Sequence, residues 1–295
     1  MPEGIILKGV GGLYTVKSSC GIYGCRARGL FRKDGITPLP GDYVTFDITD
    51  ENDMEGYISG ISDRRNDLVR PAVANVDLAF IVVSPLGPEP DFMLVDKLIC
   101  IFESKGIEPV ICINKSDLAD YGTIEEIGRP YEKAGYSVIA TNAKSGDGID
   151  RLESMLPGRV ALFSGQSGVG KSTLLNRIIG DYRMETGELS EKIGRGKHTT
   201  RHAEFIEADS GFIVDTPGFS SLDPGLLDYT RIPHLYREFR KYEDKCRFGG
   251  CLHMNEPGCA VKEAVEENLI SRDRHSRYVK IYMQAKEAET RRRGY

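Results

Sequence analysis

The stretch GQSGVGKS, residues 165–172, decides the fold class of this chain. It follows the apolar run RVALF, residues 159–163, and leads into a segment that has the composition of a helix. In this strand–loop–helix context, Gly-x-x-x-x-Gly-Lys-Ser cradles nucleotide phosphates with backbone N–H groups, while its lysine reaches the outer phosphates and its serine reaches Mg²⁺. We therefore predict an α/β P-loop fold, with nucleotide contacts from Gly165, Gln166, Ser167, Gly168, Val169, Gly170, Lys171, Ser172 and Thr173.

A second motif, NKSD at residues 114–117, follows the apolar run 109–113. Asn-Lys-x-Asp reads guanine, because the carboxylate of Asp117 accepts hydrogen bonds from a ring N–H and an amino group that adenine does not offer. A buried carboxylate left unpaired rejects the wrong base by ~10⁴-fold. Taken alone, the motif could equally cap a helix. Beside the phosphate loop, we expect GTP contacts from Asn114, Lys115, Ser116 and Asp117.

The stretch TNAKSGDG, residues 141–148, is a candidate second base-contacting loop. Clusters of Gly, Asp and Ser are usually ordinary turns, so the stretch is weak evidence by itself. Its expected GTP contacts are Asn142, Ala143 and Lys144.

The order of the motifs is unusual, because the base reader precedes the phosphate loop. This order predicts a GTPase domain whose strands are circularly permuted. Each motif follows directly on an apolar run, and ligands of open α/β sheets bind beyond the carboxyl ends of the strands. We expect the motifs to meet at one edge of a sheet.

The stretch DTPG, residues 215–218, ends a further apolar run. We expect Asp215 to hold Mg²⁺ and the Gly218 N–H to face the γ-phosphate. A polar loop, residues 194–205, lies between the phosphate loop and this motif, and a solvated loop without a ligand is the alternative. The expected magnesium set is Ser172, Thr199, Thr200 and Asp215.

Phe219 stands where many GTPases have a glutamine that orients the attacking water. An apolar side chain cannot hold that water, so we predict slow hydrolysis that a partner accelerates. His198 is the nearest polar replacement, although a solvated histidine without a catalytic role is at least as compatible with the sequence. The candidate catalytic residues are His198 and Thr200.

The stretch CRFGGCLHMNEPGC, residues 246–259, contains three cysteines and one histidine. Three thiolates and one imidazole make a tetrahedral structural zinc site that leaves no position for water. Ordinary buried thiols are the alternative. The expected zinc ligands are Cys246, Cys251, His253 and Cys259.

The chain of 295 residues suits two or three domains. Val44, Phe46 and Ile48 alternate with polar residues, which predicts a small β-barrel over residues 1–65, either oligonucleotide-binding or merely structural. Residues 66–222 form the predicted GTPase domain, and residues 223–295 form a mainly helical zinc-binding domain.

The overall composition does not indicate nucleic-acid binding, because the net charge of the chain is −5. Residues 270–295 nevertheless carry eight Lys/Arg against three acids, about +5 in side-chain charge. The apolar run 78–83 is far shorter than a membrane span, and the N-terminus lacks the pattern of a signal peptide. We expect a cytoplasmic protein that makes no membrane contact.

Taken together, the order NKSD, TNAKSGDG, GQSGVGKS, GRGKHTTR, DTPGF and then C-x₄-C-x-H-x₅-C resembles the circularly permuted family called ribosome small-subunit-dependent GTPase A. The resemblance covers essentially the whole chain. It implies an N-terminal OB-fold, a permuted GTPase domain, a C-terminal zinc domain with one structural Zn²⁺, and Mg²⁺ bound with GTP. It also implies hydrolysis of GTP to GDP and phosphate during late maturation of the small ribosomal subunit, with that subunit stimulating the reaction.

For RNA contact we expect the barrel, the basic terminal helix and the arginines at the domain junction, which are Arg64, Arg65 and Arg70. The protein is expected to act as a monomer on the subunit and its rRNA. Two other functions remain open. One is an ATP-dependent phosphotransferase, which NKSD argues against, and the other is a nucleotide-gated RNA-binding module whose hydrolysis is incidental.

Overall fold

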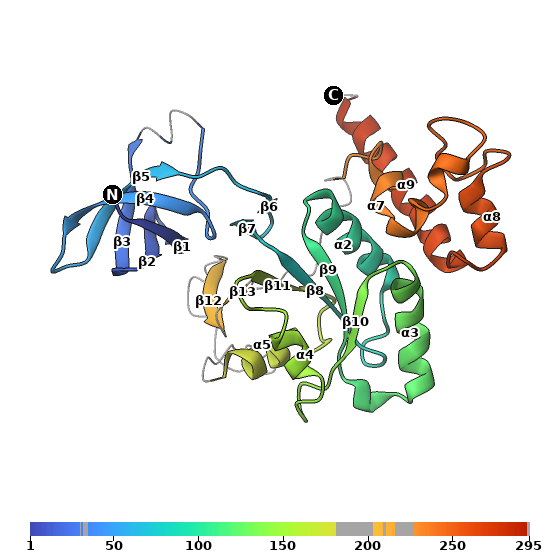
Figure 1. Cartoon of the computed structure of the whole chain (residues 1–295), viewed down its shortest axis with the longest axis horizontal. Coiled ribbons are helices and arrows are strands. Elements are labelled where there is room, and N and C mark those ends of the chain that lie inside the picture. Colours follow the sequence, from blue (N-terminus) through green and yellow to red (C-terminus); the bar gives the residue numbers. More distant parts are fainter. Residues whose placement is uncertain (30, 32–34, 181–202, 209–210, 216–226, 294–295) are drawn as a thin grey trace. The chain divides into compact units, whose positions relative to one another are not determined.

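A computed structural model describes residues 1–29, 31, 35–180, 203–208, 211–215 and 227–293. The chain divides into two compact units, each built from separate stretches of sequence (Figure 1). The first unit comprises Met1–Leu78, Glu153–Phe163 and Ile178–Phe219, and the second comprises Ala79–Leu152, Ser164–Arg177 and Ser220–Tyr295. The predicted division at residues 65 and 222 stays a prediction.

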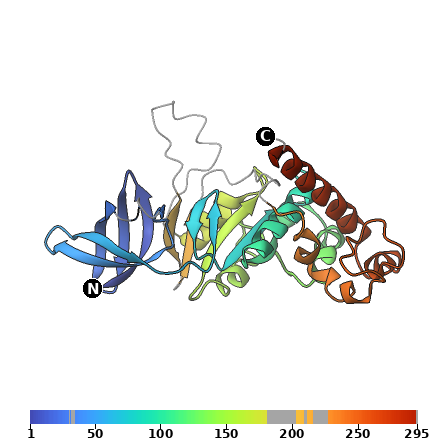
Figure 2. The same cartoon turned by 90° about the horizontal axis from the view of Figure 1, so that it is seen from above.

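The N-terminal strands of the first unit form a closed barrel (Figure 2). Its strands follow the order β1-β2-β3-β5-β4, and β4 pairs back to β1. Among these five strands, the β3–β5 pair is parallel and the other pairs are antiparallel. This confirms the predicted OB-fold barrel. The strands are β1 Glu3–Val10, β2 Leu13–Ser18, β3 Gly21–Ala27, β4 Tyr43–Asp50 and β5 Glu55–Ile61.

Alternating side chains fill the barrel, as the sequence predicts. Val44 and Phe46 of β4 are buried, and they join Ile6, Val16, Tyr23, Cys25 and Ile58 in one core cluster. Register shifts in β1 and β4 mark irregularities of the bulge type, which let short strands bend enough to close.

The rest of the first unit adds strands that the sequence analysis found only in part. β13 (Gly211–Asp215) pairs parallel to β11 (Val160–Gly165) and antiparallel to β12 (Glu204–Ala208), and β12 pairs with β1. The predicted polar loop 194–205 therefore ends within a strand, because Glu204 and Phe205 belong to β12. A two-stranded hairpin of β6 (Asp67–Val69) and β7 (Ala72–Ala74) was also not expected.

The second unit contains strands in the order β10-β9-β8, with β9 and β10 parallel. Helices α2 and α3 pack on β9, and α3 also packs on β10 (Figure 1). The expected apolar face of α2 is present, since Val95, Ile99 and Phe102 are buried. The bounds are β8 Leu78–Val83, α2 Phe92–Ser104, β9 Glu108–Ile113, η1 Ser116–Leu118, α3 Tyr121–Lys133, β10 Ser137–Ala140, α4 Ile149–Glu153 and α5 Lys171–Ile179.

The C-terminal part of the second unit is mainly helical, as predicted. It ends in the long basic helix α9, and both α7 and α9 pack against α2. Within the described ranges, no helix combines the length and the apolar character needed to cross a membrane. The elements are α7 Ile232–Leu235, η3 Arg237–Phe239, η4 Glu243–Lys245, α8 Ala260–Glu266 and α9 Arg272–Arg293.

Candidate nucleotide and metal sites

The phosphate loop lies between β11, which ends at Gly165, and α5, which begins at Lys171. Two positions of this loop require glycine, because neighbouring atoms lie too close to leave room for a Cβ. A Cβ on Gly165 would lie 2.2 Å from the Val82 carbonyl oxygen, and a Cβ on Gly170 would lie 2.4 Å from Nδ2 of Asn114. Gly170 also has a φ of +93°, which side-chain-bearing residues rarely adopt. The strand–loop–helix arrangement predicted from the motif is present.

Lys171 folds over its own loop. Its Nζ donates to the carbonyl oxygens of Gly165, at 2.8 Å, and of Gln166, at 2.7 Å. Burial lowers the pKa of Lys171 to about 8, because the ammonium group has left water, and no carboxylate of the described residues pairs with it. A bound polyanion would supply the missing negative charge. The position of Lys171 and its lowered pKa are therefore both suited to binding a phosphate group.

Asn114 ties three loops together. This side chain is 1% exposed, and its Nδ2 donates to the Val169 carbonyl oxygen at 2.8 Å. Its Oδ1 accepts hydrogen bonds from Oγ1 of Thr141 and from the backbone N–H of Ala143, both at 3.2 Å. One amide thus connects the NKSD loop to the phosphate loop and to the loop of residues 141–148.

Lys115 makes a second connection, to a loop that the sequence analysis did not single out. Its Nζ donates to the carbonyl oxygens of Gly87 and Gly168, both at 2.7 Å. Gly87 lies in residues 84–91, between β8 and α2. The signal was available, because this loop follows the carboxyl end of a buried strand, as the other loops of the site do.

A pocket of about 140 Å³ lies where the two base loops meet the phosphate loop. Asp117 and Lys115 line it from the NKSD side, and η1 is anchored there by the Ser116 N–H, which donates to the Thr141 carbonyl oxygen at 3.1 Å. Nearly all lining residues are among the predicted nucleotide contacts. The lining comprises Asn114, Lys115, Asp117, Leu118, Asn142, Ala143, Lys144, Gly170 and Thr173.

Asp215 ends β13, and its Oδ1 is buried without a hydrogen-bond partner among the described residues. Burial raises the pKa of Asp215, and so does the nearby carboxylate of Glu204, whereas Lys8 opposes the shift. Glu204 is the direct cross-strand neighbour of Asp215 and accepts a 2.7 Å hydrogen bond from Nζ of Lys8. A buried carboxylate oxygen without a donor is suited to a cation, which agrees with a magnesium role for Asp215.

The nucleotide-binding and magnesium-binding roles of the predicted residues stay predictions. Ser172 lies in the first turn of α5, and Ser167 lies in the phosphate loop. The expected switch residues fall outside the described part of the chain, so their roles stay predictions; they are His198, Thr199, Thr200 and Gly218.

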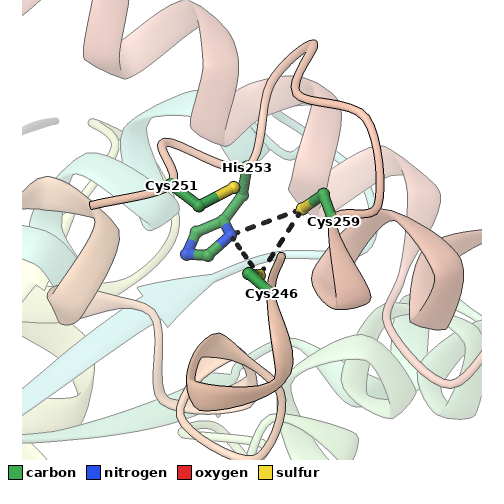
Figure 3. Close-up of side chains that lie close together, drawn as sticks. All are labelled: Cys246, Cys251, His253 and Cys259. Atoms are coloured by element: carbon green, nitrogen blue, oxygen red, sulfur yellow. Dashed lines mark hydrogen bonds between the residues drawn. The ribbon is translucent and has the colours of Figure 1, made fainter. Parts of the chain in front are cut away.

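The four predicted zinc ligands converge in the second unit (Figure 3). Nδ1 of His253 lies 3.6 Å from Sγ of Cys246 and 3.5 Å from Sγ of Cys259, and the latter two sulfurs are 4.0 Å apart. All four ligand atoms, including Sγ of Cys251, lie within 4.8 Å of one another. Tetrahedral zinc with bonds of about 2.0–2.3 Å requires ligand separations of about 3.5–3.8 Å. This donor set fits a structural zinc ion.

The loop around the cluster is held from both sides. The Glu256 carboxylate accepts backbone N–H bonds from Leu252, Met254 and Asn255. On α9, Nε2 of His275 lies 2.7 Å from the His253 carbonyl oxygen, and the Tyr278 hydroxyl donates to the Leu252 carbonyl. The zinc loop and the terminal helix therefore form one packed element.

Two family models match this chain. The model described as RsgA GTPase matches residues 61–224, and the model described as RsgA N-terminal domain matches residues 3–58. Two curated relatives bear the name small ribosomal subunit biogenesis GTPase RsgA. The relative from Geobacillus kaustophilus is 47% identical over 99% of this chain and 100% of its own length. The relative from Caldanaerobacter subterraneus subsp. tengcongensis is 46% identical, with 98% of each chain covered.

Two solved structures have the same fold. A crystal structure of YloQ, described as a circularly permuted GTPase, has a TM-score of 0.82 and 36% identity, with 97% of this chain and 96% of that chain covered. The crystal structure of YjeQ from Thermotoga maritima has a TM-score of 0.84 and 34% identity, with coverages of 96% and 98%. Both likenesses cover nearly the whole of this chain.

Proposed function

The chain belongs to the RsgA GTPase family, and from this premise we propose that it hydrolyses GTP to GDP and phosphate during late maturation of the small ribosomal subunit. We propose further that the bound subunit stimulates the reaction and that the nucleotide state controls binding to rRNA. The observation that carries the GTP assignment is the buried Asn114–Val169 hydrogen bond, which fixes the guanine-reading loop on the phosphate loop. The pocket beside that bond contains Asp117.

In this proposal the protein residues bind and orient the nucleotide. Asp117 would select guanine, Lys171 would neutralise the outer phosphates, and the phosphate-loop N–H groups would hold the remaining oxygens. Mg²⁺, held by Ser172 and Asp215 together with Thr199 or Thr200, would stabilise the charge of the transferring phosphoryl group. His198 is the proposed group that positions water, and Thr200 is its proposed neighbour in the switch.

The zinc ion would have a structural role. With four protein ligands, Cys₃His leaves no open coordination position, so the ion would fold the loop 246–259 and contribute no chemistry. The proposed rRNA contacts are the barrel and α9. Arg64 and Arg65 already pair internally with Asp42 and Asp77, which makes Arg70 the better junction candidate.

We also propose that the switch following β13 moves the C-terminal part, so that loss of the γ-phosphate releases RNA. Equal RNA affinity with GDP and with a non-hydrolysable GTP analogue would contradict this coupling. A monomer in the cytoplasm, where ribosomes mature, is the form in which this function would operate.

The experiment that tests the function is GTP turnover measured in parallel with small subunits, large subunits and free rRNA. We expect strong stimulation by small subunits alone, with a salt dependence that reflects phosphate contacts. Lys171→Ala should abolish turnover in every arm, which excludes a contaminating GTPase. If small subunits bind but leave turnover at its basal rate, the nucleotide-gated RNA-binding module that Phe219 leaves open becomes the better description.

A further inference from the structure

Arg274 occupies the centre of a buried ion cluster that joins the terminal helix to the nucleotide-binding part of the second unit. Its side chain is 1% exposed. Nε and Nη2 donate to the two carboxylate oxygens of Glu238, at 2.6 and 3.3 Å, and Nη1 donates to Oδ1 of Asp96. Glu238 belongs to η3 and Asp96 to α2, so one guanidinium links three elements.

The cluster is balanced in charge. Arg277, one turn along α9, donates to Oδ2 of Asp96, so that two arginines face two carboxylates. The guanidinium of Arg274 also lies over three tyrosine rings, at 5.0 Å from the ring centroid of Tyr131 on α3, 5.7 Å from Tyr136 and 5.1 Å from Tyr236. A buried ion cluster is weak evidence for added stability, because apolar residues of similar volume often serve as well. Its geometry instead fixes how the packed elements are oriented.

The consequence of that orientation lies at the first turn of α2. Arg277 lies 5.5 Å from the ring centroid of Phe92, the first residue of the helix, and Asp91 caps the same turn by accepting from the Leu94 N–H at 2.9 Å. Residues 84–91 directly precede this turn. They include Gly87. The Lys115 ammonium group donates to the Gly87 carbonyl oxygen and also to the carbonyl oxygen of Gly168 in the phosphate loop.

We propose that Arg274 is a positioning residue for the nucleotide site. By holding α2 against α9 at Asp96, it supports the first turn that Arg277 contacts at Phe92, and so keeps residues 84–91 where Lys115 can clamp them to the phosphate loop. The zinc-stabilised C-terminal part thereby sets how firmly the nucleotide is held. The effect is reciprocal by linkage, so a ligand that changes how α9 packs on α2 would change nucleotide affinity. The inference deepens the proposed function and rests on it only for the identity of the nucleotide.

The test uses the full-length, zinc-loaded protein without ribosomes. In the variant Arg274→Met/Glu238→Gln, the cluster loses one positive and one negative charge, and Asp96 keeps Arg277 as its partner. We expect release of a fluorescent GDP analogue to accelerate about fivefold or more, which is the lower end of common coupling between sites. Backbone hydrogen exchange should rise at residues 84–91 and stay unchanged at residues 246–259.

The matched control is Arg240→Gln. Arg240 comes from the same C-terminal part and binds Glu103 at the other end of α2, where Arg237 remains as a partner. We expect GDP release from this control to stay within about twofold of the wild type, since the link lies far from residues 84–91.

A folded, zinc-loaded double variant with unchanged GDP release would overturn the inference, as would a higher exchange rate at every element alike. If the double variant does not fold, the variant Arg277→Gln replaces it, and we expect this variant also to release GDP faster than the wild type. An unchanged rate of GDP release from Arg277→Gln would refute the proposal. Failure of the proposed function is a separate result. It would appear as absent guanine-nucleotide binding or absent stimulation by small subunits, and neither is the quantity compared here.

Discussion

GTP binding should take up a proton near pH 8, because Lys171 is buried and has no carboxylate partner in the part of the chain that the structure describes. In the ligand-free protein, burial lowers the pKa of this lysine to about 8, and its contacts are two neutral carbonyl groups. Phosphate oxygens would stabilise the ammonium form, so the pKa rises again in the complex. In the nucleotide complex, Lys171 is then protonated at a pH where Lys171 is neutral in a fraction of the nucleotide-free protein.

The magnitude follows from linkage. With a free pKa of about 8, roughly a tenth of the lysine is neutral at pH 7 and about half is neutral at pH 8, so binding takes up about 0.1 and 0.5 proton, respectively. The sign is fixed, since affinity is fully present below the free pKa and falls as pH rises through it. Between pH 7 and pH 8.5 the affinity should weaken about fourfold.

Isothermal titration calorimetry in buffers with different ionisation enthalpies measures this proton directly. GDP and GTP should both show it, because the lysine contacts a phosphate in either state. Lys171→Arg is the matched variant, since guanidinium stays charged throughout the range while ionisation of the guanine ring is common to both proteins. Zero proton uptake at pH 8 in the wild type, or equal uptake in the arginine variant, would refute the reasoning.

Three further predictions concern the base site, the loop scaffold and the zinc site. Asp117→Asn should reduce the preference for GTP over ATP by about 10³-fold or more, which competition binding measures, because the guanine donors lose their carboxylate; an unchanged preference would place the base elsewhere. Asn114→Ala should cost about 3 kcal/mol in the free energy of unfolding, since three buried groups lose their partner, and urea denaturation with and without GDP checks it. Asn52→Ala, at an exposed turn of the barrel, serves as its control. Cys259→Ser should remove most of the zinc found by metal analysis and lower the thermal midpoint, whereas Cys20→Ser, at an exposed position, should change neither.

The sequence predicted the elements whose patterns are local. The apolar runs that end at the nucleotide motifs became β9, β10, β11 and β13, and the period-2 alternation of Val44 and Phe46 became the inward face of a barrel strand. The helix with Val95, Ile99 and Phe102 on one face became α2. The spacing of apolar residues shows which face of a strand or helix is buried. Because this relation holds in every fold, such elements can be predicted from the sequence.

Contacts between residues far apart in sequence could not be predicted from these local patterns. The sequence analysis placed Glu204 and Phe205 in a polar loop, because β12 is a short strand and one of its two partners, β1, lies 196 residues away in sequence at the Lys8–Glu204 pair. The sequence analysis assigned the basic terminal helix to RNA contact, yet Arg274 of that helix is among the most buried side chains of the described chain. Its partners, Asp96 and Glu238, lie 178 and 36 residues away. Nothing in the spacing of charges along α9 distinguishes it from its exposed neighbours.

The contacts of Asn114 and Lys115 explain why a GTPase site tolerates permutation of its chain. Asn114 bonds Val169 across 55 residues, and Lys115 bonds Gly168 across 53, so the site is assembled by side chains that connect loop to loop. The entropic cost of closing such loops grows only slowly with their length, so the order in which the strands occur has little effect on stability once these contacts form. What permutation changes is which loop adjoins the next part of the chain. In the sequence, the expected switch after β13 precedes the C-terminal helices, and α7 and α9 pack on α2. The coupling proposed above would therefore act on the C-terminal part through two elements, the switch and α2.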